Sequence, residues 1–195
     1  RAVAMGRSNL ALVLKDLGEL AAARQLFEQA LASSLKTYGE GHPAIARRRH
    51  NLALVLKDLG ELAAARQLVE QALASDLKTY GEDHRAVAKG HNNLALVLKD
   101  LGELAAARQL VEQALASDLK TYGEDHPEVA TGRHNLALVL KDLGELVTAR
   151  QLFEQALVSD LKTYGEDHPK VARVRHNLAR VRQDLGEPAV AADEI

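Results

Sequence analysis

The hydrophobic positions of the chain recur every three or four residues, and glycines interrupt the pattern at regular points. One such apolar stripe follows Pro43 and is formed by Ile45, Leu52, Leu56 and Leu59. This spacing predicts a helix, and proline suits its first position because the ring fixes a helical φ there. Gly60 follows the stripe and is expected to end the helix in a left-handed conformation.

A second stripe begins near Glu61, where a carboxylate suits the positive end of a helix dipole, and Gly81 ends it. Its apolar positions are Leu62, Ala65, Leu68, Val69, Ala72, Leu73, Leu77 and Tyr80. The two helices of this hairpin are expected to have about 16 and 18 residues. The recurring tyrosines at its end, of which Tyr80 is one, are interpreted as packing anchors with their hydroxyls at the surface.

The hairpin is repeated along the chain. The segment NLALVLKDLGEL begins at Asn9, Asn51, Asn93 and Asn135, with a divergent copy at Asn177, so each step is 42 residues. The repeats are 1–42, 43–84, 85–126 and 127–168, and 169–195 is a partial capping repeat. One hairpin cannot bury both of its stripes, whereas stacked hairpins can. The sequence therefore predicts a single all-α solenoid over residues 1–195.

The partial repeat differs from the others where they are apolar. Arg180 and Arg182 stand at the positions of Leu138 and Leu140, as expected where no further repeat follows. We interpret Val171–Leu185 as a capping helix, and the segment after Pro188 as a short helix or a frayed tail.

The repeat resembles the tetratricopeptide repeat, in the 42-residue form of kinesin light chains and of C-terminal arrays of signalling NTPases. The pattern that carries this resemblance in the second repeat is Leu52, Ala53, Leu56, Gly60, Leu62, Ala65, Val69 and Ala72. Phe27 and Phe153 supply the usual aromatic at the position of Val69, whereas Arg49 stands near the usual aromatic of the first helix. The resemblance implies a right-handed superhelix that binds proteins or peptides in a concave groove lined by first helices.

Composition excludes several other classes of protein. The net charge is -2, which argues against a nucleic-acid binder, and there is no cysteine for a disulfide or a thiolate. No apolar run reaches the length of a membrane span, and the N-terminus has no signal peptide. We expect a cytoplasmic location, and we interpret the chain as a fragment of a larger signalling or adaptor protein.

Histidine is the candidate metal ligand of this sequence. His42, His84, His126 and His168 each precede a first helix, and His50, His134 and His176 lie within one. One histidine per repeat does not form a cluster, so helix capping or exposure to solvent is expected instead. No motif for a nucleophile, a phosphate loop or a dinucleotide is present. We therefore expect no metal, no cofactor and no enzymatic activity.

The copies differ mainly where each first helix begins. Two positions that lie three residues apart vary between the copies. The first holds Arg47, Lys89 and Arg173, and the second holds His50, Asn92, His134 and His176. One asparagine recurs in every first helix, and these form a row of Asn9, Asn51, Asn93, Asn135 and Asn177. The row could hold the extended backbone of a peptide, since a side-chain amide both donates and accepts hydrogen bonds. Leu54, Leu96 and Leu138 form an apolar row beside it. Drift at exposed positions and hydrogen bonds between helices are the structural alternatives.

Together these residues predict a groove for a protein or an extended peptide, and the cationic variable positions favour an acidic one. Two other readings remain open. The array could be architectural, setting a spacing or associating end to end with other copies, or it could have been assembled by design from one unit.

Overall fold

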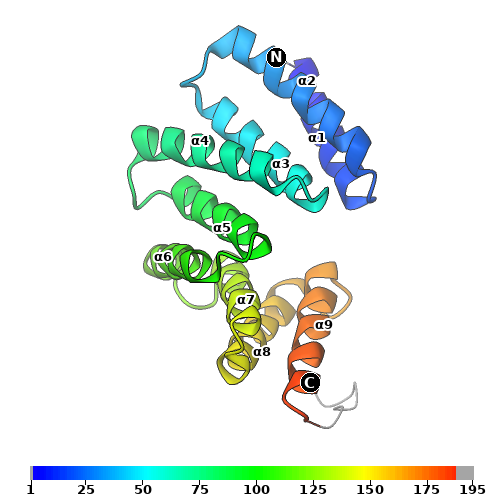
Figure 1. Cartoon of the computed structure of the whole chain (residues 1–195), viewed down its shortest axis with the longest axis vertical. Helices are drawn as coiled ribbons and strands as arrows, with labels where there is room; N and C mark the ends of the chain where they lie inside the picture. Colours follow the sequence, from blue (N-terminus) through cyan, green and yellow to red (C-terminus); the bar gives the residue numbers. More distant parts are fainter. Residues whose placement is uncertain (1, 188–195) are drawn as a thin grey trace. The chain divides into compact units, whose positions relative to one another are not determined.

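The computed structural model describes residues 2–187, and the side chains from residue 5 onward. Within this range the chain forms helices joined by short turns, with no strand (Figure 1). The helices are α1 (Ala2–Asp16), α2 (Leu20–Tyr38), α3 (Pro43–Asp58), α4 (Leu62–Tyr80), α5 (Arg85–Asp100), α6 (Leu104–Tyr122), α7 (Pro127–Asp142), α8 (Leu146–Tyr164) and α9 (Pro169–Asp184). The predicted all-α class is confirmed.

Each repeat consists of a first helix and a longer second helix. α3 has 16 residues, as the sequence predicts, and α4 has 19, one more than expected. Pro43 occupies the first turn of α3, whereas α5 begins at Arg85 with the same length. The proline is therefore compatible with the helix start but is not required for it.

Two glycines set the turns of each repeat. Gly60 has a φ of 79°, and the Glu61 N–H that follows it donates to the carbonyl of Leu56 at 2.8 Å. Gly81 has φ 79° and ψ 171°, a combination that side chains with a Cβ avoid. A side chain at either position would strain the backbone, which explains why a glycine ends each helix.

The core is built from small and branched aliphatic side chains. Ala65, Val69 and Ala72 of α4 are fully buried, and so are Phe27 and Phe153 at the positions equivalent to Val69. α4 packs against α3 before it and α5 after it, and α8 packs in the same way between α7 and α9. Alanine at the contacts lets the helix axes approach closely. This arrangement confirms the predicted helical-repeat solenoid.

The chain divides into two compact units, Arg1–Glu103 and Leu104–Ile195. The first contains α1 to α5 and the second contains α6 to α9. The single continuous array over residues 1–195 stays a prediction. The helix expected over Val171–Leu185 is present as α9 (Pro169–Asp184), with Val171, Val174, Leu178 and Val181 buried, and its capping role stays a prediction. The segment that follows Pro188 lies outside the described residues.

Candidate functional site

A histidine caps the start of α3, α5, α7 and α9. The Nδ1 atom of His42 accepts a hydrogen bond from the Ala44 N–H at 3.1 Å, and His84, His126 and His168 cap their helices in the same way. The four rings also stack on the tyrosine four residues earlier, with centroids 4.1 to 4.4 Å apart. The capping role that the sequence predicts for these histidines is confirmed, and the stacks lie where the chain enters α3, α5, α7 and α9.

The structure separates the two variable positions of the first helices. Arg47, Lys89 and Arg173 are exposed, whereas His50, Asn92 and His134 are buried. Positions three residues apart differ in direction by about 60° around a helix, and this offset turns the later position toward the second helix. In the partial repeat His176 stays exposed.

Two of these histidines lie in different surroundings. The Nε2 atom of His50 is 3.0 Å from the Oδ2 atom of Asp76, so this buried pair joins α3 to α4. His134 lies edge-on to the ring of Phe153, with centroids 5.3 Å apart. Burial, assisted by the charge of Arg173, lowers the pKa of His134 from 6.5 to about 4. His134 is therefore neutral at physiological pH.

The asparagine and leucine rows are only partly accessible. Asn9 is exposed, Asn51 and Asn177 are half-buried, and Asn93 and Asn135 are buried. Leu54, Leu96 and Leu138 are half-buried. A bound segment would therefore meet Asn9, Asn51 and Asn177 and the edges of the leucine row more readily than it would meet Asn93 or Asn135.

Charge differs between the two ends of a first helix. Near the end of α3, Lys57 lies 2.8 Å from Asp58 and 3.4 Å from Asp100 of α5. Burial opposes the charge of Lys57, but these ion pairs outweigh it and raise its pKa. Near the beginning, Arg47 and Lys89 have no acidic partner among residues 2–187. The charges of Arg47 and Lys89 therefore remain uncompensated at the starts of α3 and α5.

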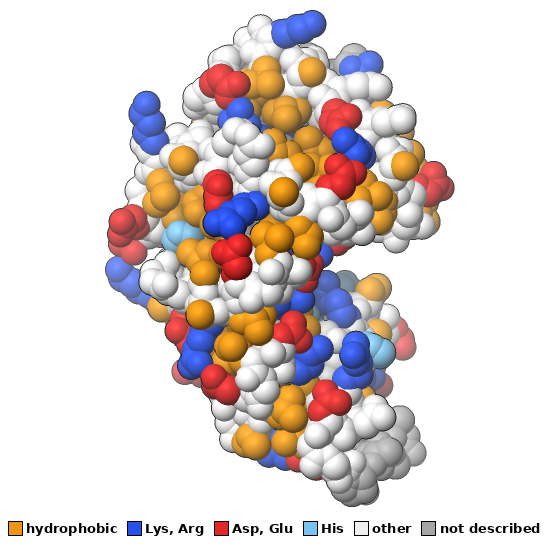
Figure 2. All heavy atoms as spheres, viewed as in Figure 1, with side chains coloured by type: hydrophobic (Ala, Val, Ile, Leu, Met, Phe, Trp, Pro, Cys, Tyr) orange, Lys and Arg blue, Asp and Glu red, His pale blue; other side chains and the backbone are white. Residues whose placement is uncertain are grey.

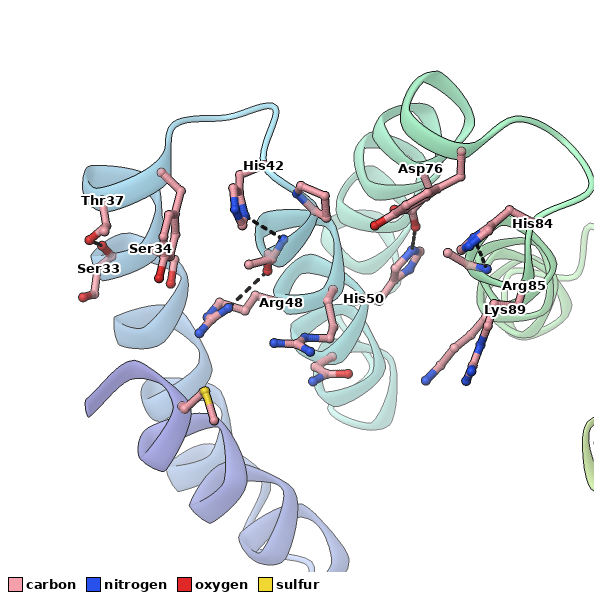
Figure 3. Close-up of a pocket in the computed structure, with 18 residues that line it drawn as sticks. Ser33, Ser34, Thr37, His42, Arg48, His50, Asp76, His84, Arg85 and Lys89 are labelled. Atoms are coloured by element: carbon pink, nitrogen blue, oxygen red, sulfur yellow. Dashed lines mark hydrogen bonds and ion pairs between the residues drawn. The ribbon is translucent and has the colours of Figure 1, made fainter. Parts of the chain in front are cut away.

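A cavity of about 470 Å³ opens at these helix starts in the first unit (Figure 3). We call it the basic pocket; it is lined by residues of α1 to α5 and of the turns between them. Its cationic lining residues are Arg47, Arg48, Arg85 and Lys89. Asp76 is its only carboxylate, and the hydrogen bond to His50 occupies that group. The pocket therefore has a positive potential suited to an anionic group.

Two features of this surface were not predicted from the sequence. Arg48 is buried, at 4% exposure, although it stands in a run of three arginines. The signal was the small residue at the same position of other repeats, Gly90 and Gly132, which marks a tight contact. The second feature is a set of ion pairs between an arginine of a second helix and the glutamate that follows the next first helix: Arg24 to Glu61, Arg66 to Glu103, Arg108 to Glu145 and Arg150 to Glu187.

Neither a metal cluster nor a membrane span emerges from the described part of the chain. No three His, Cys, Asp or Glu side chains of residues 2–187 converge on one point. In the same range, no helix combines the length and the apolar character that crossing a bilayer requires. The arrangement of first and second helices can instead be compared directly with known repeat proteins.

The tetratricopeptide repeat matches four overlapping segments, residues 2–78, 50–120, 86–158 and 128–193. The chain belongs to the tetratricopeptide-repeat family. Tetratricopeptide-repeat proteins generally act as scaffolds for protein interactions, and they are generally not catalytic. No similar sequence was found among curated proteins.

Solved tetratricopeptide-repeat structures resemble this chain over most of its length. One, described as a kinesin light chain of Podosopora anserina with nearly identical TPR-like repeats, is 30% identical with a TM-score of 0.72. The match covers 93% of this chain and 86% of that one. BtubC (BKLC) from P. vanneervenii is 24% identical, covers 95% and 74% of the two chains, and has a TM-score of 0.75. The predicted resemblance to kinesin light chains is confirmed.

A third structure is a Rap protein in complex with the competence and sporulation factor. It is 16% identical with a TM-score of 0.80, and the match covers 92% of this chain and 48% of that one. At this identity the likeness concerns the fold alone.

Proposed function

We propose that this chain is a non-enzymatic binding module whose first-helix surface holds an extended, acidic segment of another protein. The observation that carries the proposal is the charge of the basic pocket. Arg47, Arg85 and Lys89 line it without an acidic partner among the described residues, and its one carboxylate is bound to His50. Acidic side chains are the complement of such a surface.

The polar and apolar rows beside the pocket would hold the rest of the segment. The half-buried amide of Asn51 also lines the pocket, and Leu54 follows it by one turn on the same helix. An amide would bind the backbone of the segment, and the leucine would accept an apolar side chain. The family of this chain, whose members generally act as scaffolds for protein interactions, supports a protein ligand. The buried residues of the first helices would not contact the segment directly but would hold the surface in position; they are Asn93, Asn135, Asn92, His50 and His134.

A pair of charge-reversed variants tests this function. Peptides are first selected from a random library against the unaltered chain, and their dissociation constants are then measured by fluorescence anisotropy. Changing Arg47→Glu together with Lys89→Glu should weaken binding by about tenfold or more, since both contacts become repulsive. The matched control is Lys36→Glu with Lys78→Glu, which makes the same charge change at exposed positions of α2 and α4.

The salt dependence provides a second measurement on the same peptides. Attraction between exposed charges is screened over about 8 Å at physiological ionic strength, so the affinity should fall as salt rises. Selection of peptides without acidic residues, or equal affinities for the two double variants, would show that the basic pocket is not the binding site.

Association with another copy is the alternative function, and it stays a prediction. On the face drawn in Figure 2, hydrophobic side chains are interspersed with charged ones. Light scattering over a concentration series tests this alternative, and a chain that is monomeric throughout would eliminate it.

A further inference from the structure

The basic pocket contains a buried guanidinium that lacks a counter-ion. Arg48 is 4% exposed, and its only hydrogen bond in the structure runs from NH1 to the carbonyl of Ala44 at 3.2 Å. Its Nε atom is buried without a partner, and no carboxylate of residues 2–187 pairs with it. Burial and the charge of Arg47 lower the pKa of Arg48. A buried charge is costly unless an opposite charge accompanies it.

The repeats show that this environment is specific to one position in the chain. Where the second repeat has Arg48, the others have Gly6, Gly90, Gly132 and Val174. Where the first repeat has Ser34, the others have Asp76, Asp118 and Asp160. The first two repeats have thus gained a cation and lost a carboxylate at two positions that line the same cavity.

The helix packing around Arg48 differs from the packing at the equivalent positions of other repeats. A Cβ atom built at Gly90 would lie 2.9 Å from the Cδ1 atom of Leu73, and one built at Gly132 would lie 3.1 Å from that of Leu115. A side chain at position 90 or 132 would therefore press against the end of a leucine side chain, which would have to shift. Between α2 and α3, by contrast, a whole arginine side chain is accommodated, and the cavity opens beside it (Figure 3).

The hydroxyl of Ser34 is a second polar group that is buried without a hydrogen-bond partner. It is 1% exposed, and its Oγ atom is buried without a hydrogen-bond partner in the described part of the chain. Figure 3 shows Arg48 extending from α3 toward α2, the helix that carries Ser34. Both residues line the basic pocket. Two buried donors that lack an acceptor therefore border one cationic cavity.

We propose that Arg48 and Ser34 form a receptor for one oxyanion group, a carboxylate or a phosphorylated side chain, carried by the segment that the first-helix surface binds. This inference rests on the function proposed above. A guanidinium presents parallel N–H groups that match the two oxygens of a carboxylate or a phosphate. The hydroxyl of Ser34 donates a further hydrogen bond. The volume of about 470 Å³ leaves room for the side chain that carries the oxyanion.

Two variants taken from the chain's own repeats test the receptor. Arg48→Gly installs the residue found at positions 90 and 132, and Ser34→Asp installs the residue found at 76, 118 and 160. Both residues are compatible with helices of nearly the same sequence, and circular dichroism verifies the fold. The first variant removes the guanidinium. The second places a carboxylate in the pocket, where it would neutralise Arg48 in place of the ligand.

The probes are inorganic phosphate and glutarate, titrated separately into the ¹⁵N-labelled full chain. The arginine Nε–H resonances are followed by NMR, with Arg24 as the internal reference because Glu28 and Glu61 already bind it. We expect a saturable shift of the Arg48 Nε–H resonance. We expect the affinity to fall about tenfold or more in both variants, the effect of losing one or two charge-assisted hydrogen bonds. Stronger binding of glutarate indicates a carboxylate, and stronger binding of phosphate indicates a phosphorylated side chain.

The outcomes separate this inference from the proposed function. If neither probe moves the Arg48 resonance, or if both variants bind the probes as the unaltered chain does, the receptor is wrong. If library peptides bind and their affinity is unchanged by Arg48→Gly, the binding module stands without this receptor. If the probes bind at Arg48 while no acidic peptide is selected, the oxyanion receptor stands and the peptide-binding function is wrong.

Discussion

Protonation of His134 should make the stability of the chain fall in mildly acidic solution. The ring is 4% exposed, and burial lowers its pKa from 6.5 to about 4. Between these two values the unfolded chain binds a proton at His134 and the folded chain does not. Stability therefore rises with pH across this window, and it is lost as the pH falls from about 6.5 toward about 4.

The size of the effect follows from the same two values. A tenfold change in proton affinity corresponds to about 1.4 kcal/mol. The drop from 6.5 to about 4 therefore gives a loss of about 3 kcal/mol when the window has been crossed completely. The steepest dependence expected from one such group is about 1.4 kcal/mol per pH unit.

The perturbation is His134→Asn, which installs the residue found at the equivalent position 92. The free energy of unfolding is measured by urea titration of both proteins at several pH values from 4.5 to 7.5. Asp160 opposes the effect, because burial raises its pKa and its carboxylate destabilises the fold as the pH rises. Both proteins contain Asp160, so the difference between them isolates His134.

As the pH decreases, the free energy of unfolding of the unaltered chain should fall relative to that of the asparagine variant. If the difference between the two proteins stays constant from pH 7.5 to 4.5, the unfavourable protonation of a buried His134 is refuted. A change of opposite sign would mean that the folded state stabilises the imidazolium, contrary to its desolvation.

Two further predictions concern the ends and the number of repeats. Arg182 of α9 lies 2.9 Å from Glu154, at the position where Leu56, Leu98 and Leu140 are buried. Arg182→Leu should expose an apolar surface and promote association in light scattering; a monomer at high concentration would contradict a capping role. Deleting residues 85–126 should preserve the helical fold and lower the denaturation midpoint by one regular step, because each repeat contacts its neighbours. Complete loss of helicity by circular dichroism would contradict that model.

The fold was predictable because its determinants are local. Pro43, Gly60 and Gly81 mark helix ends through backbone conformation, and their spacing is visible without any knowledge of packing. The same applies to the core, since Ala65 and Val69 lie on the apolar stripe of a helix that was correctly bounded. A repeated hairpin then leaves stacking as the way to bury both stripes.

The surface was less predictable because its residues depend on contacts between helices. Periodicity places Arg47 and His50 on neighbouring parts of one helix, but it does not reveal which of them α4 covers. Asp76 decides this, because it forms a buried hydrogen bond with His50. A single charged residue within an apolar stripe gives no indication of its partner. Arg48 was detectable only by comparison with Gly90 and Gly132, whose small size indicates close packing.

The row of Arg–Glu pairs has a consequence for how such a chain can change in length. Arg24 binds Glu61, Arg66 binds Glu103, and Arg108 binds Glu145, always 37 residues apart. Each 42-residue repeat thus supplies the glutamate that pairs with the repeat before it and the arginine that pairs with the repeat after it. Duplication or deletion of a whole repeat in the gene would leave each arginine beside a glutamate. Insertion of a single residue between an arginine and its glutamate would instead shift the pair out of register. Exposed pairs of this kind contribute little stability individually, but they penalise any recombination that does not preserve the period.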